Sequence, residues 1–400
     1  MIKTVIPAQN TNPDVESYGF FARTFSWKDL EKEFTWQQTG NVNIAHEAID
    51  KWAANRDVRD RTALVFEKAG AAREYSFLEI RETSSRWANL LTEHGFFLGD
   101  RLFIFLPPCA DIYFIMVACA RLGVIFSPLY ANLSTDELEA RIRNARPKGI
   151  ITHPNIADVL PQRAVASLEH VFFLEPPLLG NFPGEKLVGE SLASYPAKTI
   201  TRWLKPASPL YLVYTSGSHG PPKGVVHAHQ DMLGHLATAR YVLNLRAGDR
   251  LWTDADPGWV TGTVYGAFAP WLCGAVSVIQ ADDFSASTWY RTLERHRVSS
   301  WYTTPRTLSR LQVAGDDLPG RYDLSSLRHI ASVGEHLSPE LIFWAKQVVG
   351  RPPHDTWWMS ETGMICVANF PFMNIKPGSM GRAFPGVEAT VLDETGEPVA

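Results

Sequence analysis

Cysteine is scarce in this chain of 400 residues, with four in all and no Cys-x-x-Cys pair among them. A disulfide framework belongs to short, cysteine-dense secreted chains, and a structural zinc site needs closely spaced ligands. The wide and irregular spacing of Cys109, Cys119, Cys273 and Cys366 fits neither pattern. We therefore expect buried free thiols in a reducing compartment.

An excess of charge of one sign and a long apolar run are missing as well. The 38 Lys and Arg residues against 42 Asp and Glu residues leave a net charge of −4, so bulk charge predicts neither a nucleic acid nor an anionic membrane as partner. The longest strongly apolar run, residues 112–120, is about half of what a membrane span needs. The first 20 residues contain no apolar stretch typical of a secretory signal. These absences predict a cytoplasmic protein without a membrane partner, and no pattern indicates an oligomeric state.

Three familiar motifs are also absent. The chain contains neither G-x-x-x-x-G-K-[ST] nor G-x-G-x-x-G, which argues against a P-loop ATPase and a Rossmann dehydrogenase. It lacks G-x-S-x-G, which argues against an α/β-hydrolase. The composition is that of an ordinary globular protein, with 45% hydrophobic and 20% charged residues. At roughly 150 residues per domain, the length predicts two to three domains.

Short apolar segments alternate with helical patterns through the first half of the chain. Capping boxes at Ser76-x-x-Glu79 and Ser134-x-x-Glu137 predict two helix starts, because hydroxyl and carboxylate satisfy free backbone N–H groups there. Residues 111–122 predict a buried helix that ends at Gly123. Strands are expected at 101–106, 124–128 and 149–152. This β-α-β order predicts an α/β fold with mostly parallel sheets covered by helices on both faces.

A second α/β series follows. Strands are expected at 210–214, 276–280, 300–304 and 329–333, and Ser338-Pro339-Glu340 predicts a helix start. The Pro-, Gly- and Ser-rich residues 175–206 predict a surface excursion. Beyond residue 370 turns prevail, with a strand expected at 387–392 and a hairpin turn at 393–396.

These patterns predict four segments. Residues 1–60 are an N-terminal extension that packs on two α/β lobes, which are expected at 61–232 and 233–370. Residues 371–400 are expected to begin a small β-barrel subdomain.

The segment from Tyr214 to Gly224, which reads Tyr-Thr-Ser-Gly-Ser-His-Gly-Pro-Pro-Lys-Gly, is the most informative. It follows an expected strand and combines hydroxyls, glycines and one lysine in a tight turn. Glycines allow backbone N–H groups to approach an anion, and the lysine adds a point charge. An ordinary Ser/Gly surface loop is the alternative interpretation, but such a loop needs no apolar strand directly before it.

This segment resembles the signature loop of the adenylate-forming superfamily, Thr-Ser-Gly-[Ser/Thr]-Thr-Gly-x-Pro-Lys-Gly. His219 stands where the family has threonine, which removes one hydroxyl donor. Three further segments fit the acetyl-CoA synthetase branch of that superfamily: Asp256-Pro-Gly-Trp-Val-Thr-Gly262, Ser332-Val-Gly-Glu-His336 and His354-Asp-Thr-Trp-Trp-Met-Ser-Glu-Thr-Gly363. Taken singly, their tryptophans are better explained by core packing and Glu361 by a solvated charge. The ordered set is not explained in that way.

The resemblance covers essentially the whole chain and implies roles for particular residues. The ATP phosphates would lie on Thr215, Ser216, Gly217, Ser218, His219, Gly220 and Lys223. The adenine and ribose would lie on Gly334, Glu335, His336, Asp355, Thr356, Trp357 and Ser360. Glu361 would bind the Mg²⁺ that bridges the triphosphate, since a carboxylate oxygen suits a hard cation. Catalytic roles would fall to Lys223, Glu361 and Thr215.

The resemblance also implies an acyl pocket walled by Val260, Thr261, Val333 and Trp358. The Trp358 indole would fill space that a longer acid needs, and each excluded CH₂ is worth roughly 1–3 kcal/mol of discrimination. The implied reaction joins acetate to coenzyme A through an acetyl-adenylate, with ATP cleaved to AMP and pyrophosphate. Acetate, ATP and coenzyme A would be the small-molecule partners.

Several alternatives stay open at this point. In the family, a Tyr-x-x-Gly-Asp motif and a catalytic lysine lie further toward the C-terminus, and no Tyr-x-x-Gly-Asp occurs in these 400 residues. We therefore expect ATP and acetate binding with little complete turnover. Propionate or another acid is an alternative substrate, although Trp358 argues against large acids. A non-catalytic nucleotide binder is the alternative from another class, motivated by His219 and His336.

Overall fold

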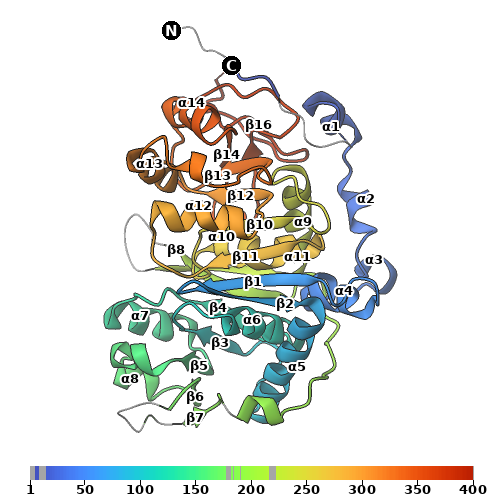
Figure 1. The fold of residues 1–400 in the computed structure, drawn as a ribbon. Helices are drawn as coiled ribbons and strands as arrows, with labels where there is room; N and C mark the ends of the chain where they lie inside the picture. The colour runs from blue at the N-terminus through green and yellow to red at the C-terminus, as the bar shows by residue number, and fades with distance from the viewer. Residues whose placement is uncertain are drawn as a thin grey trace.

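The structure is a computed structural model that describes residues 5–8, 15–176, 182, 184–189, 191–215 and 222–399. Within these residues the chain forms two mostly parallel sheets with helices packed on their faces, as Figure 1 shows. The larger sheet occupies the upper part of that view and the smaller sheet the lower part. The predicted fold class is therefore confirmed.

The larger sheet is built from the strands that follow residue 249, together with one early hairpin. Its strands are β1 (Thr62–Lys68), β2 (Ala71–Ser76), β10 (Arg250–Thr253), β11 (Val276–Gln280), β12 (Ser300–Thr303), β13 (His329–Ser332), β14 (Pro353–Trp357), β15 (Val367–Ala368) and β16 (Arg382–Ala383). They are ordered β16-β15-β14-β13-β12-β10-β11-β1-β2. Neighbours from β14 to β1 are parallel, whereas the strands at both edges pair antiparallel.

The smaller sheet follows the same plan. Its strands are β3 (Arg101–Ile104), β4 (Ile125–Pro128), β5 (Gly149–Thr152), β6 (His170–Phe173), β7 (Glu185–Leu187), β8 (Pro209–Thr215) and β9 (Lys223–Ala228). They are ordered β7-β6-β5-β3-β4-β8-β9, and only the β8/β9 pair is antiparallel. This antiparallel pair brings both ends of the glycine-rich segment to the sheet edge.

The helices of the described residues cover the sheets. They are α1 (Tyr18–Thr24), α2 (Trp27–Glu31), α3 (Trp36–Thr39), α4 (Lys51–Ala54), α5 (Phe77–Glu93), α6 (Asp111–Leu122), α7 (Thr135–Ala145), α8 (Gln162–Val165), α9 (Met232–Tyr241), α10 (Val260–Thr263), α11 (Ala269–Leu272), α12 (Ala286–Arg295), α13 (Pro305–Ala314) and α14 (Pro339–Val348). Both predicted capping boxes are present, at the starts of α5 and α7. No helix in the described part of the chain combines the length and apolarity needed to cross a membrane.

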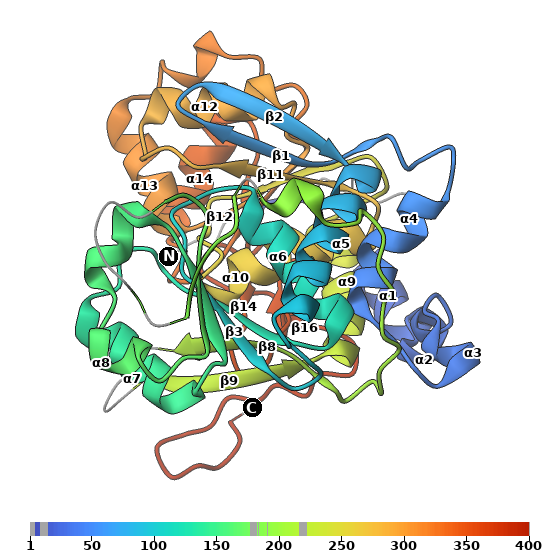
Figure 2. The same cartoon turned by 90° about the horizontal axis from the view of Figure 1, so that it is seen from below.

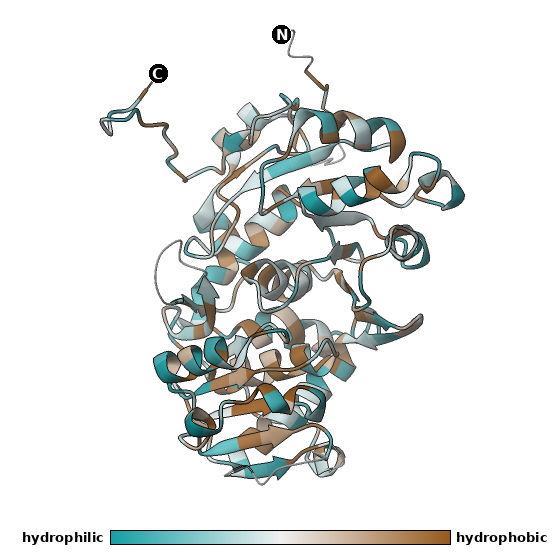
Figure 3. Cartoon of the chain, turned by 90° about the vertical axis from the view of Figure 1, so that its left-hand side faces the viewer, coloured by the Kyte–Doolittle hydropathy of each residue, from teal (hydrophilic) through white to brown (hydrophobic). Residues whose placement is uncertain are grey.

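Helix α6 lies inside the molecule, between the two sheets (Figures 1 and 2). Every residue from Ile112 to Leu122 is buried, as its apolar sequence predicts. The helix ends at Gly123 with φ of 72°, which also matches the prediction. One apolar cluster joins Leu64 of β1, Ile115 of α6 and Leu102 of β3, so the sheets share a core. Figure 3 shows the apolar colour on many of the strands, whereas the helices carry both apolar and polar colours.

Two expectations are wrong. Residues 387–392 do not form a strand: only Leu392 is bridged, to Pro398, and residues 388–399 are exposed and pair with no strand of either sheet. The turn predicted at 393–396 is present, with Gly396 N donating to Asp393 O at 3.1 Å. The stretch 175–206 is not wholly a surface excursion, because its described part includes β7 at the edge of the smaller sheet.

The sheets do not follow the expected segment boundaries. Strands β1 and β2 fall within the predicted first lobe, yet β1 pairs with β11 of the larger sheet, Leu64 opposite Ser277. Strand β16 falls within the expected β subdomain, yet it extends the same sheet. A short apolar strand can join either sheet, and periodicity cannot decide which. The domain division itself stays a prediction.

Candidate functional site

A cavity of about 490 Å³ lies at the carboxyl ends of strands from both sheets. Residues that follow or end β4 and β8 form one side, and residues that follow β12, β13 and β14 form the other. Open α/β sheets bind ligands at this edge. The lining consists of Tyr130, Arg141, Tyr214, Thr215, Trp259, Thr304, Arg306, Gly334, Glu335 and Ser360. The cavity therefore joins residues of all four sequence motifs.

The described ends of the glycine-rich segment face each other at the rim. Thr215, the last residue of β8, pairs with Lys223, the first residue of β9. Thr215 lines the cavity, and Lys223 is exposed beside it in the strand pair. The predicted phosphate-binding residues Ser216, Gly217, Ser218, His219 and Gly220 lie outside the described residues.

The turn after β13 brings Gly334 and Glu335 to the cavity. Gly334 has φ of 94°, and a Cβ placed there would stand 3.0 Å from the Trp259 ring. A side chain there is disfavoured by the backbone conformation and would also require the Trp259 ring to shift. Glu335 and the neighbouring His336 are exposed, and of these two only Glu335 lines the cavity.

Strand β14 presents its predicted residues unequally. Trp357 is 41% exposed, so its indole face is open to a ligand. The Thr356 hydroxyl is already engaged, because it donates to the Ser332 carbonyl at 2.7 Å and lies 2.8 Å from the Tyr302 hydroxyl. Burial raises the pKa of Asp355 to about 7, although its carboxylate accepts a hydrogen bond from the Thr356 backbone at 3.0 Å.

The four predicted acyl-pocket residues lie together but do not line the cavity. Val260, Thr261 and Val333 are 2%, 0% and 4% exposed, and Trp358 packs against the same cluster. Their chain neighbours Trp259 and Gly334 form the cavity wall. The Thr261 hydroxyl is buried and has no hydrogen-bond partner among the described residues. An unpaired buried hydroxyl suits a small polar ligand at this place.

Trp358 is held by a directed chain of hydrogen bonds. Its Nε1 donates to the Tyr302 hydroxyl at 3.0 Å, and the ring meets Tyr265 edge-on at 5.3 Å. Since the Thr356 hydroxyl hydrogen goes to Ser332 O, the Tyr302 hydroxyl donates to Thr356 Oγ1. Such a chain polarises its members and fixes the indole in one orientation.

Glu361 is exposed on the turn after β14, next to Ser360 of the cavity wall. No group of three or more His, Cys, Asp or Glu side chains in the described part of the chain is arranged to hold a metal. Mg²⁺ at nucleotide sites uses one or two carboxylates together with substrate phosphates and water. A single exposed carboxylate therefore fits this mode of binding.

Two arginine side chains that line the cavity were not predicted from the sequence. Arg141 on α7 donates to the Glu137 carbonyl at 2.8 Å and lies 5.4 Å from the Tyr214 ring centre. Burial lowers the pKa of Arg141, but a guanidinium stays charged at neutral pH. Arg306 on α13 is exposed and has no polar partner among the described residues. Its place just after the expected strand 300–304 was the only available signal.

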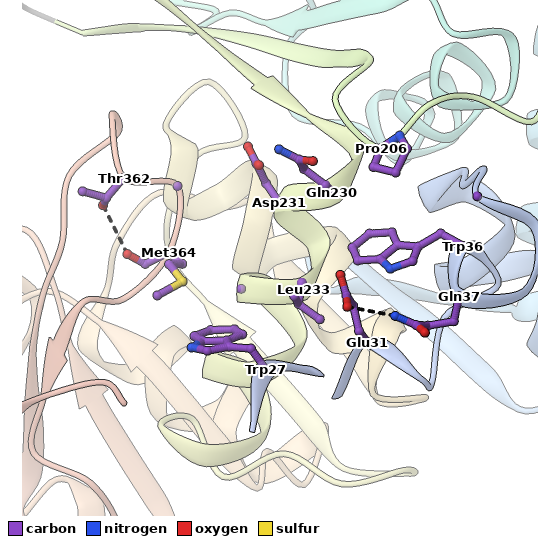
Figure 4. A pocket seen from close by; sticks show the side chains of 13 residues that line it. Trp27, Glu31, Trp36, Gln37, Pro206, Gln230, Asp231, Leu233, Thr362 and Met364 are labelled. Carbon is purple, nitrogen blue, oxygen red and sulfur yellow. Dashed lines mark hydrogen bonds between the residues drawn. The ribbon is translucent and has the colours of Figure 1, made fainter. Parts of the chain in front are cut away.

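A second cavity, of about 610 Å³, lies between the N-terminal helices and the start of α9 (Figure 4). Trp27, Glu31 and Trp36 form one wall. Asp231 and the segment Thr362–Gly363–Met364 form another, so this cavity reaches the turn that carries Glu361. No sequence motif predicts this cavity.

Comparison with known proteins places this geometry in context. The family described as AMP-binding enzyme matches residues 50–400. An acetyl-coenzyme A synthetase of Bacillus subtilis (strain 168) is 40% identical over 399 residues, which cover 98% of this chain and 68% of that protein. The enzyme of the same name from Pasteurella multocida (strain Pm70) is 34% identical over 396 residues and is covered to 60%. A solved acyl-CoA synthetase of Brucella canis superposes with a TM-score of 0.88 at 26% identity, covering 96% of this chain and 70% of that one.

Proposed function

The chain belongs to the AMP-binding enzyme family, and from that premise we propose that it holds the ATP and acetate sites of an AMP-forming acetate–CoA ligase. The observation that carries the proposal is the convergence of Thr215, Gly334, Glu335 and Ser360 in one cavity at the strand ends. The names of the Bacillus and Pasteurella relatives agree with it. The chain spans 68% of the Bacillus relative and 60% of the Pasteurella relative. The complete reaction of those enzymes is therefore only proposed for this chain.

The charges around the cavity suit a nucleoside triphosphate. Lys223 stands at its rim, and Arg141 and Arg306 line it. Guanidinium and ammonium groups stabilise the charge that develops on phosphate oxygens when a carboxylate attacks the α-phosphate. Mg²⁺, held by Glu361 and by ATP, would supply further charge neutralisation when bound. Attack yields the acetyl-adenylate and releases pyrophosphate.

The acyl group would enter beside Trp358, whose fixed indole limits the depth available. Val260 and Val333 are apolar neighbours suited to a methyl group, and the free Thr261 hydroxyl is suited to a carboxylate oxygen. We therefore propose acetate, or at most propionate, as the acid. The thiol of coenzyme A then displaces AMP from the adenylate to form the thioester.

The test is ATP–pyrophosphate exchange driven by acetate. It is run on this chain alone and with the C-terminal part of the Bacillus relative supplied as a separate polypeptide. We expect weak exchange alone and strong exchange after the addition, and Lys223→Ala should lower the exchange rate about 100-fold.

Retained ATP binding with no exchange under either condition would favour the non-catalytic nucleotide binder. Exchange with octanoate equal to that with acetate would contradict the proposed acyl pocket. Robust acetyl-CoA formation by this chain alone would contradict the expected low turnover.

A further inference from the structure

A buried histidine on strand β9 is hydrogen-bonded to the turn that carries Glu361. His227 is 4% exposed, and its Nε2 donates to the Ser360 carbonyl at 2.7 Å. A carbonyl oxygen can only accept, so this nitrogen carries a proton. The bond joins two segments that are 133 residues apart in the chain.

The ring is fixed on its other sides as well. Its Nδ1 lies 3.0 Å from Asp231 Oδ2, which also accepts from the Ala228 backbone at 3.1 Å. Burial acts to raise the pKa of Asp231, yet the hydrogen bond with His227 and the nearby His235 leave it below its ordinary value. Tyr211 stacks on the ring at 4.8 Å with an interplanar angle of 25°. The imidazole therefore has one orientation.

The turn is shaped to meet this ring. Gly363 has φ of 68°, and a Cβ there would stand 2.7 Å from His227 Cε1. Any other residue would push the turn away from β9. The cavity of Figure 4 reaches the same contact through Asp231 and Thr362.

We propose that His227, oriented by Asp231, is a positioning residue that sets Glu361 relative to Lys223. Lys223 begins β9 and His227 follows on the same strand. One strand therefore carries both the proposed phosphate-binding lysine and the histidine that holds the turn. Residues behind a metal ligand usually affect metal affinity 10–100-fold. The inference rests on the proposed function, in which Glu361 holds Mg²⁺ on ATP.

The test compares two amide replacements. In His227→Gln the amide nitrogen can occupy the position of Nε2 and still donate to Ser360, whereas in His227→Asn it can occupy only that of Nδ1 and faces Asp231. Calorimetry measures ATP affinity with and without Mg²⁺, and their ratio is the readout. We expect His227→Gln to keep the wild-type ratio and His227→Asn to lower it about tenfold, with unchanged affinity for ATP alone.

His229→Asn is the matched control, because His229 is equally buried and its Nδ1 accepts from the Ile44 backbone at 3.1 Å, a bond that Asn can keep. It should keep the ratio. If His227→Asn does not fold, Gly363→Ala replaces it in the test. The added methyl group would disturb the contact between the turn and His227, so this variant should lower the ratio of the two ATP affinities.

Equal ratios in all variants overturn the positioning role. An equal loss in His227→Gln and His227→Asn also overturns it, since the donated bond would then be irrelevant. Absence of ATP binding by the wild-type chain overturns the proposed function itself, which distinguishes the two failures.

Discussion

At the scale of single residues, the hydrogen bond from Trp358 to Tyr302 fixes the indole that we propose as a wall of the acyl pocket. Trp358→Gly removes the indole, so longer acids such as hexanoate should gain about 1–3 kcal/mol per accommodated CH₂ relative to acetate. Acid-dependent ATP–pyrophosphate exchange measures the ratio. Trp357→Gly is the matched control, because that neighbouring indole is 41% exposed and lies outside the predicted pocket. An unchanged acid preference in Trp358→Gly, or an equal change in Trp357→Gly, would remove Trp358 from the acyl pocket.

Asp355 gives a prediction about pH. Burial raises its pKa to about 7, so the folded chain binds this proton more tightly than the unfolded chain, where the value is near 3.8. The contribution of Asp355 to stability therefore falls as pH rises from about 4 to about 7. Asp355→Asn removes this titration. Relative to wild type, the variant should gain in free energy of unfolding over that range, as measured by urea denaturation at several pH values.

Comparing Asp355→Asn with wild type cancels the contributions of the other buried groups, including His354, whose pKa burial lowers to about 4. A flat difference between Asp355→Asn and wild type across this range would contradict the raised pKa.

At the scale of elements, the ends of helices were predicted better from the sequence than the pairing partners of strands. Helices α5 and α7 begin where the capping boxes indicate, and α6 ends at Gly123 as expected, because caps are local hydrogen bonds within a few residues. The strand expected at 387–392 is absent, because this segment pairs with no strand of either sheet. Contacts between side chains of different elements were not predicted from the sequence either. The buried ion pair of Arg121 and Asp50 is an example.

Arg121 at the end of α6 donates to both carboxylate oxygens of Asp50, at 2.7 and 2.6 Å. Its side chain is 2% exposed, so Asp50→Ala would leave a buried charge without its partner and should lower the free energy of unfolding by about 3–5 kcal/mol. Chemical denaturation at neutral pH measures this. Glu139→Ala breaks the pair with Arg143, whose side chain is 71% exposed, and should cost less than about 0.5 kcal/mol. Equal costs for the two variants would argue against the buried pair.

At the scale of the whole molecule, the two ends of the chain pack together. The Phe21 ring on α1 lies within 5.6 Å of the ring centres of Phe370, Phe372 and Phe384. Trp27 Nε1 also donates to the Pro385 carbonyl at 2.9 Å. The N-terminal helices lie beside the larger sheet in Figure 1, and α2 and α3 form one wall of the cavity of Figure 4.

Phe21→Ala should cost about 3–5 kcal/mol, as for other buried aromatic side chains. Since the aromatic cluster joins both ends, amide hydrogen exchange should rise in residues 366–384 as well as in α1. Phe20→Ala is the control, because Phe20 is 37% exposed and should leave exchange in 366–384 unchanged. A rise confined to α1 in Phe21→Ala would show that the two ends are not coupled.

The sequence by itself determined the alternation of strands and helices, the helix caps and the family to which the four motifs point. These features rest on local backbone chemistry and on motif spacing, which are written along the chain. Only the tertiary structure decided that β1 joins the larger sheet, that Arg141 and Arg306 reach the cavity, and that His227 is hydrogen-bonded to the turn that carries Glu361. Each of these depends on contacts between residues far apart in the chain, and no periodicity records such contacts.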